Sequence, residues 1–121
     1  MSIDKLFASF DRYLLLDEPE KADLKERAIE RRIKRRQLIL TEDEVCRHYT
    51  FVADGCFKVF QVDKKGVEHN LQFAAENDWI MITDSFYSEK KSNVNIEAIE
   101  SSTIFQISRP DLIYFFRTYP K

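Results

Sequence analysis

Residues 51–73 read FVADGCFKVFQVDKKGVEHNLQF, and this stretch decides the fold expected for the chain. Two polar breaks, 54–55 (DG) and 63–66 (DKKG), separate three short apolar runs. Glycine reaches the positive φ of a tight turn without steric cost, so Gly55 and Gly66 mark two predicted reversals. Three strands joined by these turns form a meander.

The third apolar run alternates between two kinds of side chain. Its odd-numbered positions are mostly apolar and its even-numbered positions polar: Val67, His69, Leu71 and Phe73 against Glu68, Asn70 and Gln72. This period of two is typical of a strand with one face on a core and the other in water. We expect the odd-numbered side chains to point into the core of a small β-barrel or roll.

Length and composition indicate one soluble globular domain. The 121 residues are 44% hydrophobic and 33% charged, and the Phe residues, ten in number, supply much of the core volume. A net charge of -2 gives no overall attraction to nucleic acid or to an anionic membrane. No apolar run approaches the ~20 residues that span a bilayer, and acidic residues stand where a signal peptide is basic. We expect a cytoplasmic protein with no membrane partner.

Two helices are predicted before the meander. The first, over 3–14, has one apolar stripe at helical spacing: Ile3, Phe7, Phe10 and Leu14. The second begins at Asp17, which has the spacing of a capping box with Glu20, and runs to about Glu30. Its inward positions are expected at Leu24, Ala28 and Ile29.

The segment 25–36 is the most basic part of the chain, with seven Lys or Arg against two Glu. Such a run can bind a phosphate backbone, or it can be a solvated helix end that leads into an edge strand protected by charge. We favour the second interpretation because no aromatic residue interleaves to stack on bases. The best candidates for an electrostatic contact with a partner are Arg31, Arg32, Arg35 and Arg36.

The remaining elements follow from shorter signals. Residues 37–40 are predicted as the first strand, 94–98 and 103–107 as later strands, and 80–87 is ambiguous between strand and short helix. A closing helix over about 109–118 is announced by Ser108, a proline in the first turn and the carboxylate of Asp111.

Several of these pieces together resemble the cyclic nucleotide-binding domain of Crp/Fnr-type bacterial transcription regulators. The resemblance rests on FVADGCFKVF (51–60), DKKGVEHNLQF (63–73), ENDWI (76–80), NIEAIESSTIFQIS (95–108) and RPDLIYFF (109–116). It implies a mainly β fold with flanking helices, a double-stranded β-helix or jelly-roll-like β-roll. Residues 1–121 would form one sensor domain, with two N-terminal helices over about 3–30, a roll over about 37–107 and the closing helix.

The resemblance also implies partners. A member of this family accepts a small effector in the roll, dimerises through a long helix after it, and controls a C-terminal helix-turn-helix. The chain ends at Lys121, before those parts, so it is expected to be either a fragment or a naturally short relative. DNA contact is expected only through the missing C-terminal domain, and homodimerisation in the full-length protein.

The family's phosphate cassette is degenerate in this sequence. Members that bind cyclic AMP use a Gly-Glu pair that opens a short helix and, about ten residues on, an Arg followed by Ser or Thr. Those places fall on Met81, Ile82, Ser92 and Asn93. These residues supply neither the carboxylate that contacts the ribose nor the positive charge that neutralises the phosphate. We predict no tight cyclic AMP binding. The effector pocket implied by the family is lined by Trp79, Met81, Ile82, Thr83, Ser92, Asn93 and Val94.

Two glycines of the family's roll are replaced here, by Arg36 and Asp43, which predicts locally altered turns. The cysteines, Cys46 and Cys56, are too few for a disulfide scaffold and are expected to be small core residues.

Two alternatives to a regulatory domain stay open. A cupin-like metal enzyme would need an H-x-H pair and a third His, whereas His48 and His69 are the two His present and lie far apart, so no metal or other cofactor is predicted. No G-x-S-x-G elbow supports a hydrolase, and we predict that the chain is not an enzyme. The other alternative is a stand-alone protein-interaction module that uses the basic segment.

Overall fold

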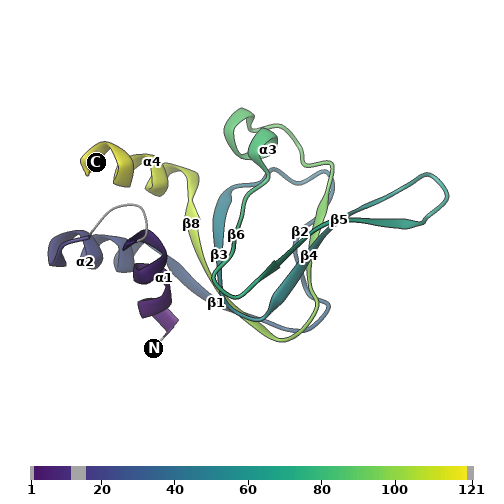
Figure 1. Ribbon diagram of the computed structural model, residues 1–121. Coiled ribbons are helices and arrows are strands. Elements are labelled where there is room, and N and C mark those ends of the chain that lie inside the picture. The colour runs from purple at the N-terminus through teal and green to yellow at the C-terminus, as the bar shows by residue number, and fades with distance from the viewer. Residues whose placement is uncertain (1, 12–15, 120–121) are drawn as a thin grey trace.

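The computed structural model describes residues 2–11 and 16–119, with backbone alone at 2, 83, 84 and 87. These residues form a roll of antiparallel strands with helices at one end, and Figure 1 shows the arrangement. This is the mainly β fold with flanking helices that the sequence predicts. Position 14 of the predicted first helix lies outside the described residues.

The strands pair in two sheets, of order β1-β8-β3-β6 and β2-β7-β4-β5. Every pairing within them is antiparallel. The strand bounds are β1 Ile29–Ile33, β2 Leu38–Leu40, β3 His48–Asp54, β4 Cys56–Val62, β5 Glu68–Ala75, β6 Trp79–Ile80, β7 Asn95–Ala98 and β8 Ser102–Ser108.

The helices divide into two groups. Helices α1 (Ser2–Asp11), α2 (Glu18–Arg27) and α4 (Arg109–Thr118) lie together at one end of the molecule, whereas α3 (Thr83–Ser88) follows β6 and lies apart from them (Figure 1). The predicted capping box of α2 is confirmed, because Asp17 Oδ1 accepts from Glu20 N at 2.9 Å and Glu20 Oε1 accepts from Asp17 N at 3.1 Å. α4 begins as its sequence predicts, with the Ser108 hydroxyl accepting from Asp111 N.

Strand β3 is buried on both faces. Phe51, Val52 and Ala53 are fully buried. The ring of Phe51 lies 5.0 Å from that of Trp79, which in turn lies 5.5 Å from Phe10 of α1. One face of β3 is therefore covered by α1, and the other faces the interior of the roll. A strand covered on both faces needs a continuous apolar run, as residues 51–53 are.

The predicted end of the second helix is wrong. α2 ends at Arg27, Ala28 is its extended C-cap, and Ile29 begins β1 with 56% of its surface exposed instead of pointing inward. The first strand is therefore Ile29–Ile33, not 37–40. Pairing with β8 accounts for the difference, because an edge strand satisfies its backbone against Gln106 and its neighbours, which local periodicity does not reveal.

The predicted core face of β5 is also wrong. Val67, Leu71 and Phe73 are 51%, 55% and 58% exposed. The hairpin of β4 and β5 projects away from the roll (Figure 1), and its register shifts between Val59 and Phe60. Such a bulge breaks the alternation of faces. His69, expected inward, is exposed, and its Nε2 lies 2.8 Å from Asp63 Oδ2.

Left-handed backbone occurs at six of the described residues, and four of them bear on the predicted turns. Gly55 and Gly66 have φ of 103° and 83°, at the two reversals expected from them. Arg36 and Asp43, which replace glycines of the family, have φ of 70° and 76°. These non-glycine residues thus hold a conformation that glycine adopts at lower cost.

Candidate functional site

The residues predicted to form the family's cassette begin at the start of α3. Ile82 is the N-cap of this six-residue helix and provides no side-chain hydrogen bond to it. Met81 and Ile82 are partly buried against the hydrophobic core. The side chain of Thr83, the next predicted pocket residue, lies outside the described part of the structure. No glutamate or glycine therefore stands at the opening of this helix.

The residues predicted to form the second half of the cassette make local hydrogen bonds. The Ser92 hydroxyl is buried, donates to Val94 O at 2.9 Å and accepts from Val94 N at 3.0 Å. Val94 is buried in the core, whereas Asn93 is exposed and its carbonyl accepts from Gln61 Nε2 at 3.2 Å. Ser92 therefore presents a hydroxyl that is already paired.

Trp79 packs between the roll and the helices. Its ring contacts Tyr49 at 4.4 Å, Phe51 at 5.0 Å and Phe10 at 5.5 Å between centroids, and its indole N–H donates to the Ser9 hydroxyl. None of the seven predicted pocket residues lines the larger cavity of the molecule.

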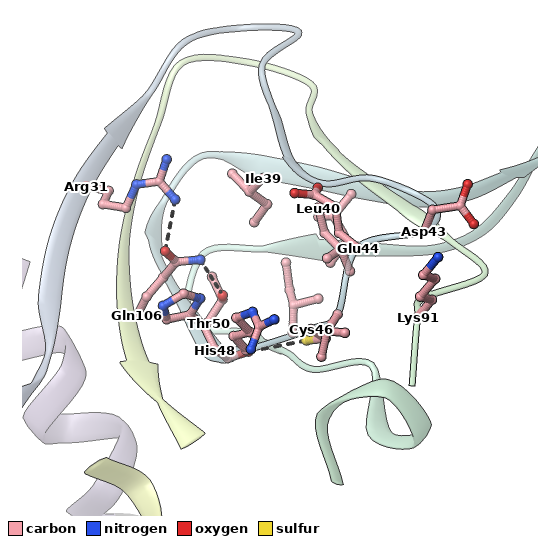
Figure 2. A pocket seen from close by; sticks show the side chains of 14 residues that line it. Arg31, Ile39, Leu40, Asp43, Glu44, Cys46, His48, Thr50, Lys91 and Gln106 are labelled. Carbon is pink, nitrogen blue, oxygen red and sulfur yellow. Dashed lines mark hydrogen bonds between the residues drawn. The ribbon is translucent and has the colours of Figure 1, made fainter. Parts of the chain in front are cut away.

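The larger cavity lies between the two sheets and has a volume of about 460 Å³. Strands β1, β3, β6 and β8 of one sheet and β2 and β7 of the other contribute to its wall, together with the segment before β3 (Figure 2). Its lining comprises Arg31, Ile39, Leu40, Asp43, Glu44, Val45, Cys46, Arg47, His48, Thr50, Ile80, Lys91, Ile96 and Gln106.

A chain of hydrogen bonds crosses one side of this cavity. Arg31 Nη1 donates to Gln106 Oε1 at 2.9 Å, and Gln106 Nε2 donates to Thr50 Oγ1 at 3.1 Å (Figure 2). Strand register explains the chain, because Gln106 pairs directly with Thr50 on β3, and Arg31 on β1 lies two residues from the direct partner of Gln106. Gln106 and Thr50 are 5% and 4% exposed, so both polar groups are fixed inside the protein.

His48 lies two residues before Thr50 on β3 and lines the same cavity. Its pKa is lowered, first by burial and then by the positive charges of Arg31 and Arg47. The imidazole is therefore neutral at neutral pH.

The far side of the cavity carries charges of both signs. Figure 2 shows Asp43, Glu44 and Lys91 there, away from Arg31. Glu44 Oε1 accepts from Thr41 N at 2.8 Å and from Thr41 Oγ1 at 2.6 Å, and these bonds lower the pKa of Glu44. The Glu44 carboxylate is thus already hydrogen-bonded to Thr41, although Glu44 lines the cavity.

The cavity wall is joined to the start of α4. His48 pairs with Ser108, the N-cap of α4, and Arg109 N donates to Arg47 O at 3.0 Å. Arg109 Nη1 also donates to Oε1 of Glu89, the residue directly after α3, at 3.0 Å. Arg47 and His48 are therefore bonded directly to the first turn of α4 and its N-cap.

The basic segment does not act as one surface. Arg31 is half-buried at the cavity, whereas Arg32, Arg35 and Arg36 are exposed. Arg36 also closes a turn, because its backbone N–H donates to Ala98 O at 2.8 Å. Arg32, Arg35 and Arg36 remain as an exposed basic set.

The described residues hold neither a metal-ligand cluster nor a membrane-spanning helix. Nowhere in 2–11 and 16–119 do three or more His, Cys, Asp or Glu side chains gather as a metal site requires. Within the same ranges no helix has the length and apolar character needed to cross a bilayer. Cys46 is buried, and Cys56 is half-buried.

Sequence reasoning missed the cavity as a unit. The one local signal was a polar residue, Gln106, inside the otherwise apolar strand TIFQI, since a buried amide needs a partner. That partner could not be named, because Arg31, Thr50 and Gln106 are far apart in sequence and meet through strand pairing.

Solved structures share this fold. The sensor domain of the transcriptional regulator DNR from Pseudomonas aeruginosa matches with a TM-score of 0.79 and 14% identity, over 95% of this chain and 75% of that chain. The catabolite activator protein of Thermus thermophilus matches with a TM-score of 0.74 and 18% identity, over 87% of this chain and 49% of that chain. The N-terminal domain of a Streptomyces coelicolor A3(2) transcriptional regulator matches with a TM-score of 0.73 and 18% identity, over 87% of this chain and 74% of that chain.

These identities establish the fold alone, and this chain spans about half the length of the Thermus protein. No curated protein matches it in sequence. The family model described as "Cyclic nucleotide-binding domain" matches residues 30–119, which is most of the chain. The resemblance found in the sequence is thereby confirmed, and the chain belongs to the cyclic nucleotide-binding domain family, with the fold of the regulatory domains of Crp/Fnr-type transcription regulators.

Proposed function

We propose that this chain is the effector-sensing regulatory domain of a Crp/Fnr-type bacterial transcription regulator, and that it does not bind cyclic AMP tightly. The family match over 30–119 and the likeness to a sensor domain of a transcriptional regulator support the first part. DNA is then bound by a region outside residues 1–121, and the working molecule is a cytoplasmic homodimer. The role is regulatory and not catalytic.

The proposed absence of tight cyclic AMP binding rests on the residues at the start of α3. Binding a phosphate there requires backbone N–H groups left open by glycine and a cation that neutralises the charge. Ile82 provides no polar group at the helix opening. By the sequence pattern, Ser92 takes the place of the family's arginine, and its hydroxyl is bonded to Val94. A phosphate buried without a counter-charge loses more hydration energy than neutral hydrogen bonds return.

Regulation follows from how α4 is attached. α4 leaves β8 at Ser108, and its first turn is bonded to Arg47 of the cavity wall and to Glu89 beside α3. An effector that favours one position of this wall favours one orientation of α4 and of whatever follows it.

Isothermal titration calorimetry with cyclic AMP tests the proposal. We expect no binding at micromolar Kd, which would correspond to about −8 kcal/mol. A double variant, Ile82→Glu with Ser92→Arg, restores the glutamate and the arginine of the cassette and is expected to bind more tightly than the unmodified chain. Thermal unfolding of each sample serves as the control for folding. Micromolar binding by the unmodified chain would contradict the proposal.

A further inference from the structure

The cavity between the sheets contains a positive charge that the described chain does not neutralise. The guanidinium of Arg31 is half-buried and bonds to the neutral amide oxygen of Gln106. Among the described side chains, those of residues 3–11, 16–82, 85, 86 and 88–119, no carboxylate forms an ion pair with it. A partly desolvated guanidinium normally pairs with an anion, and Arg31 has further N–H donors beyond the one that Gln106 accepts.

Arg31 is held in position by buried groups. Gln106 and Thr50 are more than nine-tenths buried, and their mutual hydrogen bond fixes which way the amide oxygen points. That oxygen aims at Arg31 along the cavity side (Figure 2). A supporting shell of this kind is what a preorganised binding site requires, because the cation need not be ordered when the ligand arrives.

The groups beside Arg31 also favour an anion. Arg47 and His48 also line the cavity, and the charges of Arg31 and Arg47 both act on His48, whose neutral imidazole can donate or accept one hydrogen bond. The acidic residues Asp43 and Glu44 lie on the far side with Lys91, and Glu44 is engaged by Thr41. The potential around Arg31 is therefore positive.

Between Arg31 and the charged far side, part of the lining is aliphatic. Aliphatic side chains from four separate parts of the chain form it: Ile39, Leu40, Val45, Ile80 and Ile96. The volume of about 460 Å³ lies in the range of roughly 300–1,000 Å³ typical of small-molecule sites. A cationic group beside an aliphatic wall fits a ligand that has a carboxylate and an apolar body.

We propose that this cavity binds a small organic carboxylate with an apolar body, its carboxylate on Arg31 and its body between the aliphatic side chains of the two sheets. A planar carboxylate matches the donors of a single guanidinium, whereas a phosphate dianion requires more donors and more positive charge than one arginine supplies. The site is distinct from the cassette at α3. An effect of binding on α4 through Arg47 and His48 rests on the proposed function, whereas the binding itself does not.

Histidine NMR gives a direct test, because the chain has two His and one of them, His48, lines the cavity. The probes are hexanoate and 3-phenylpropanoate, with hexanamide as the uncharged control and acetate and inorganic phosphate as anions without an apolar body. Probes of this size bind with Kd of about 1 mM. We expect both apolar carboxylates to shift the His48 signals saturably and raise its pKa, because a negative charge nearby favours the imidazolium. His69, outside the cavity, should not respond.

Two variants and one matched control assign the effect to Arg31. Arg31→Gln should weaken hexanoate binding about tenfold or more, since it removes a charge-assisted contact. Gln106→Glu keeps the side-chain shape but pairs Arg31 internally, and should weaken binding to a similar extent if Arg31→Gln fails to fold. Arg32→Gln removes an equal charge from the next, exposed position of β1 and should leave binding unchanged.

The outcomes separate this inference from the proposed function. Absence of a His48 response to either carboxylate, equal binding of hexanamide, or full binding by Arg31→Gln would each overturn the carboxylate site. Cyclic AMP binding in the calorimeter would overturn the proposed function and leave the hexanoate result standing.

Discussion

At the scale of single residues, Gly55 is the position where turn geometry and packing coincide. Its φ is 103°, and a Cβ added there would lie 2.5 Å from the Cβ and 2.8 Å from the Cα of Ser102. Ser102 cannot easily move away, because its hydroxyl accepts from Cys56 N at 3.2 Å and donates to Glu100 O at 2.8 Å. Gly66 has a φ of 83°, but a Cβ added to it would meet no atom within 4 Å.

The two glycines therefore allow a paired test. Gly66→Ala should lower the free energy of unfolding by about 1–2 kcal/mol, because a residue with a Cβ is strained in the left-handed conformation. Gly55→Ala should cost about 2–5 kcal/mol, because overpacking against Ser102 adds to the same backbone term. Urea unfolding of both variants measures the difference. Equal losses would show that Ser102 yields and that packing at Gly55 is unimportant.

At the scale of elements, β5 shows how a strand with a clear period can still be misread. Its apolar positions include Leu71 and Phe73, yet both are exposed. Two features of the hairpin cause this: the register shift opposite Val59 and the projection of the hairpin beyond the roll. β4, paired with it, is buried at Phe57 and Val59 because it lies between β5 and β7.

Substitution of one Phe on each strand tests this difference. Phe57→Ala should lower the free energy of unfolding by about 3–5 kcal/mol, since a fully buried ring leaves a cavity. Phe73→Ser should change it by less than about 1 kcal/mol, because the 58% exposed ring loses little burial. Denaturant unfolding measures both, and a large loss for Phe73→Ser would show that the hairpin packs against the roll.

At the scale of the whole molecule, aromatic rings join the helical end to the roll. Phe115 of α4 lies 5.8 Å from Phe10 of α1, and Phe10 contacts Trp79 beside β3. Polar groups add to this junction, because Arg27 of α2 bonds Asp111 of α4 at 2.7 Å. Helices α1 and α4 therefore lie together at one end of the roll (Figure 1).

Neighbouring phenylalanines on α4 separate packing from surface exposure. Replacement of Phe115, which is 2% exposed, by Ala should lower the free energy of unfolding by about 3–5 kcal/mol. Phe116, 48% exposed on the same helix, should cost less than about 1 kcal/mol. Thermal and urea unfolding give both values. A small loss at Phe115 would mean that α4 detaches from the roll without loss of stability.

The candidate sites were predictable from the sequence to different extents. Met81, Ile82 and Ser92 were assigned to the family's cassette by their places in its sequence pattern, and this assignment stays a prediction. The larger cavity was not located, although Arg31 was singled out as a cation. Its partner Gln106 lies on another strand, and no local pattern states which strands pair or in what register.

The sequence by itself determined the two glycine turns, the capped starts of α2 and α4, and membership of the cyclic nucleotide-binding domain family, because these depend on residues close together in the chain. Only the tertiary structure decided that β1 begins at Ile29, that β5 turns its apolar residues to solvent, and that Arg31, Gln106 and Thr50 meet. The physical reason is that backbone pairing and burial depend on segments far away in sequence, and these override local periodicity.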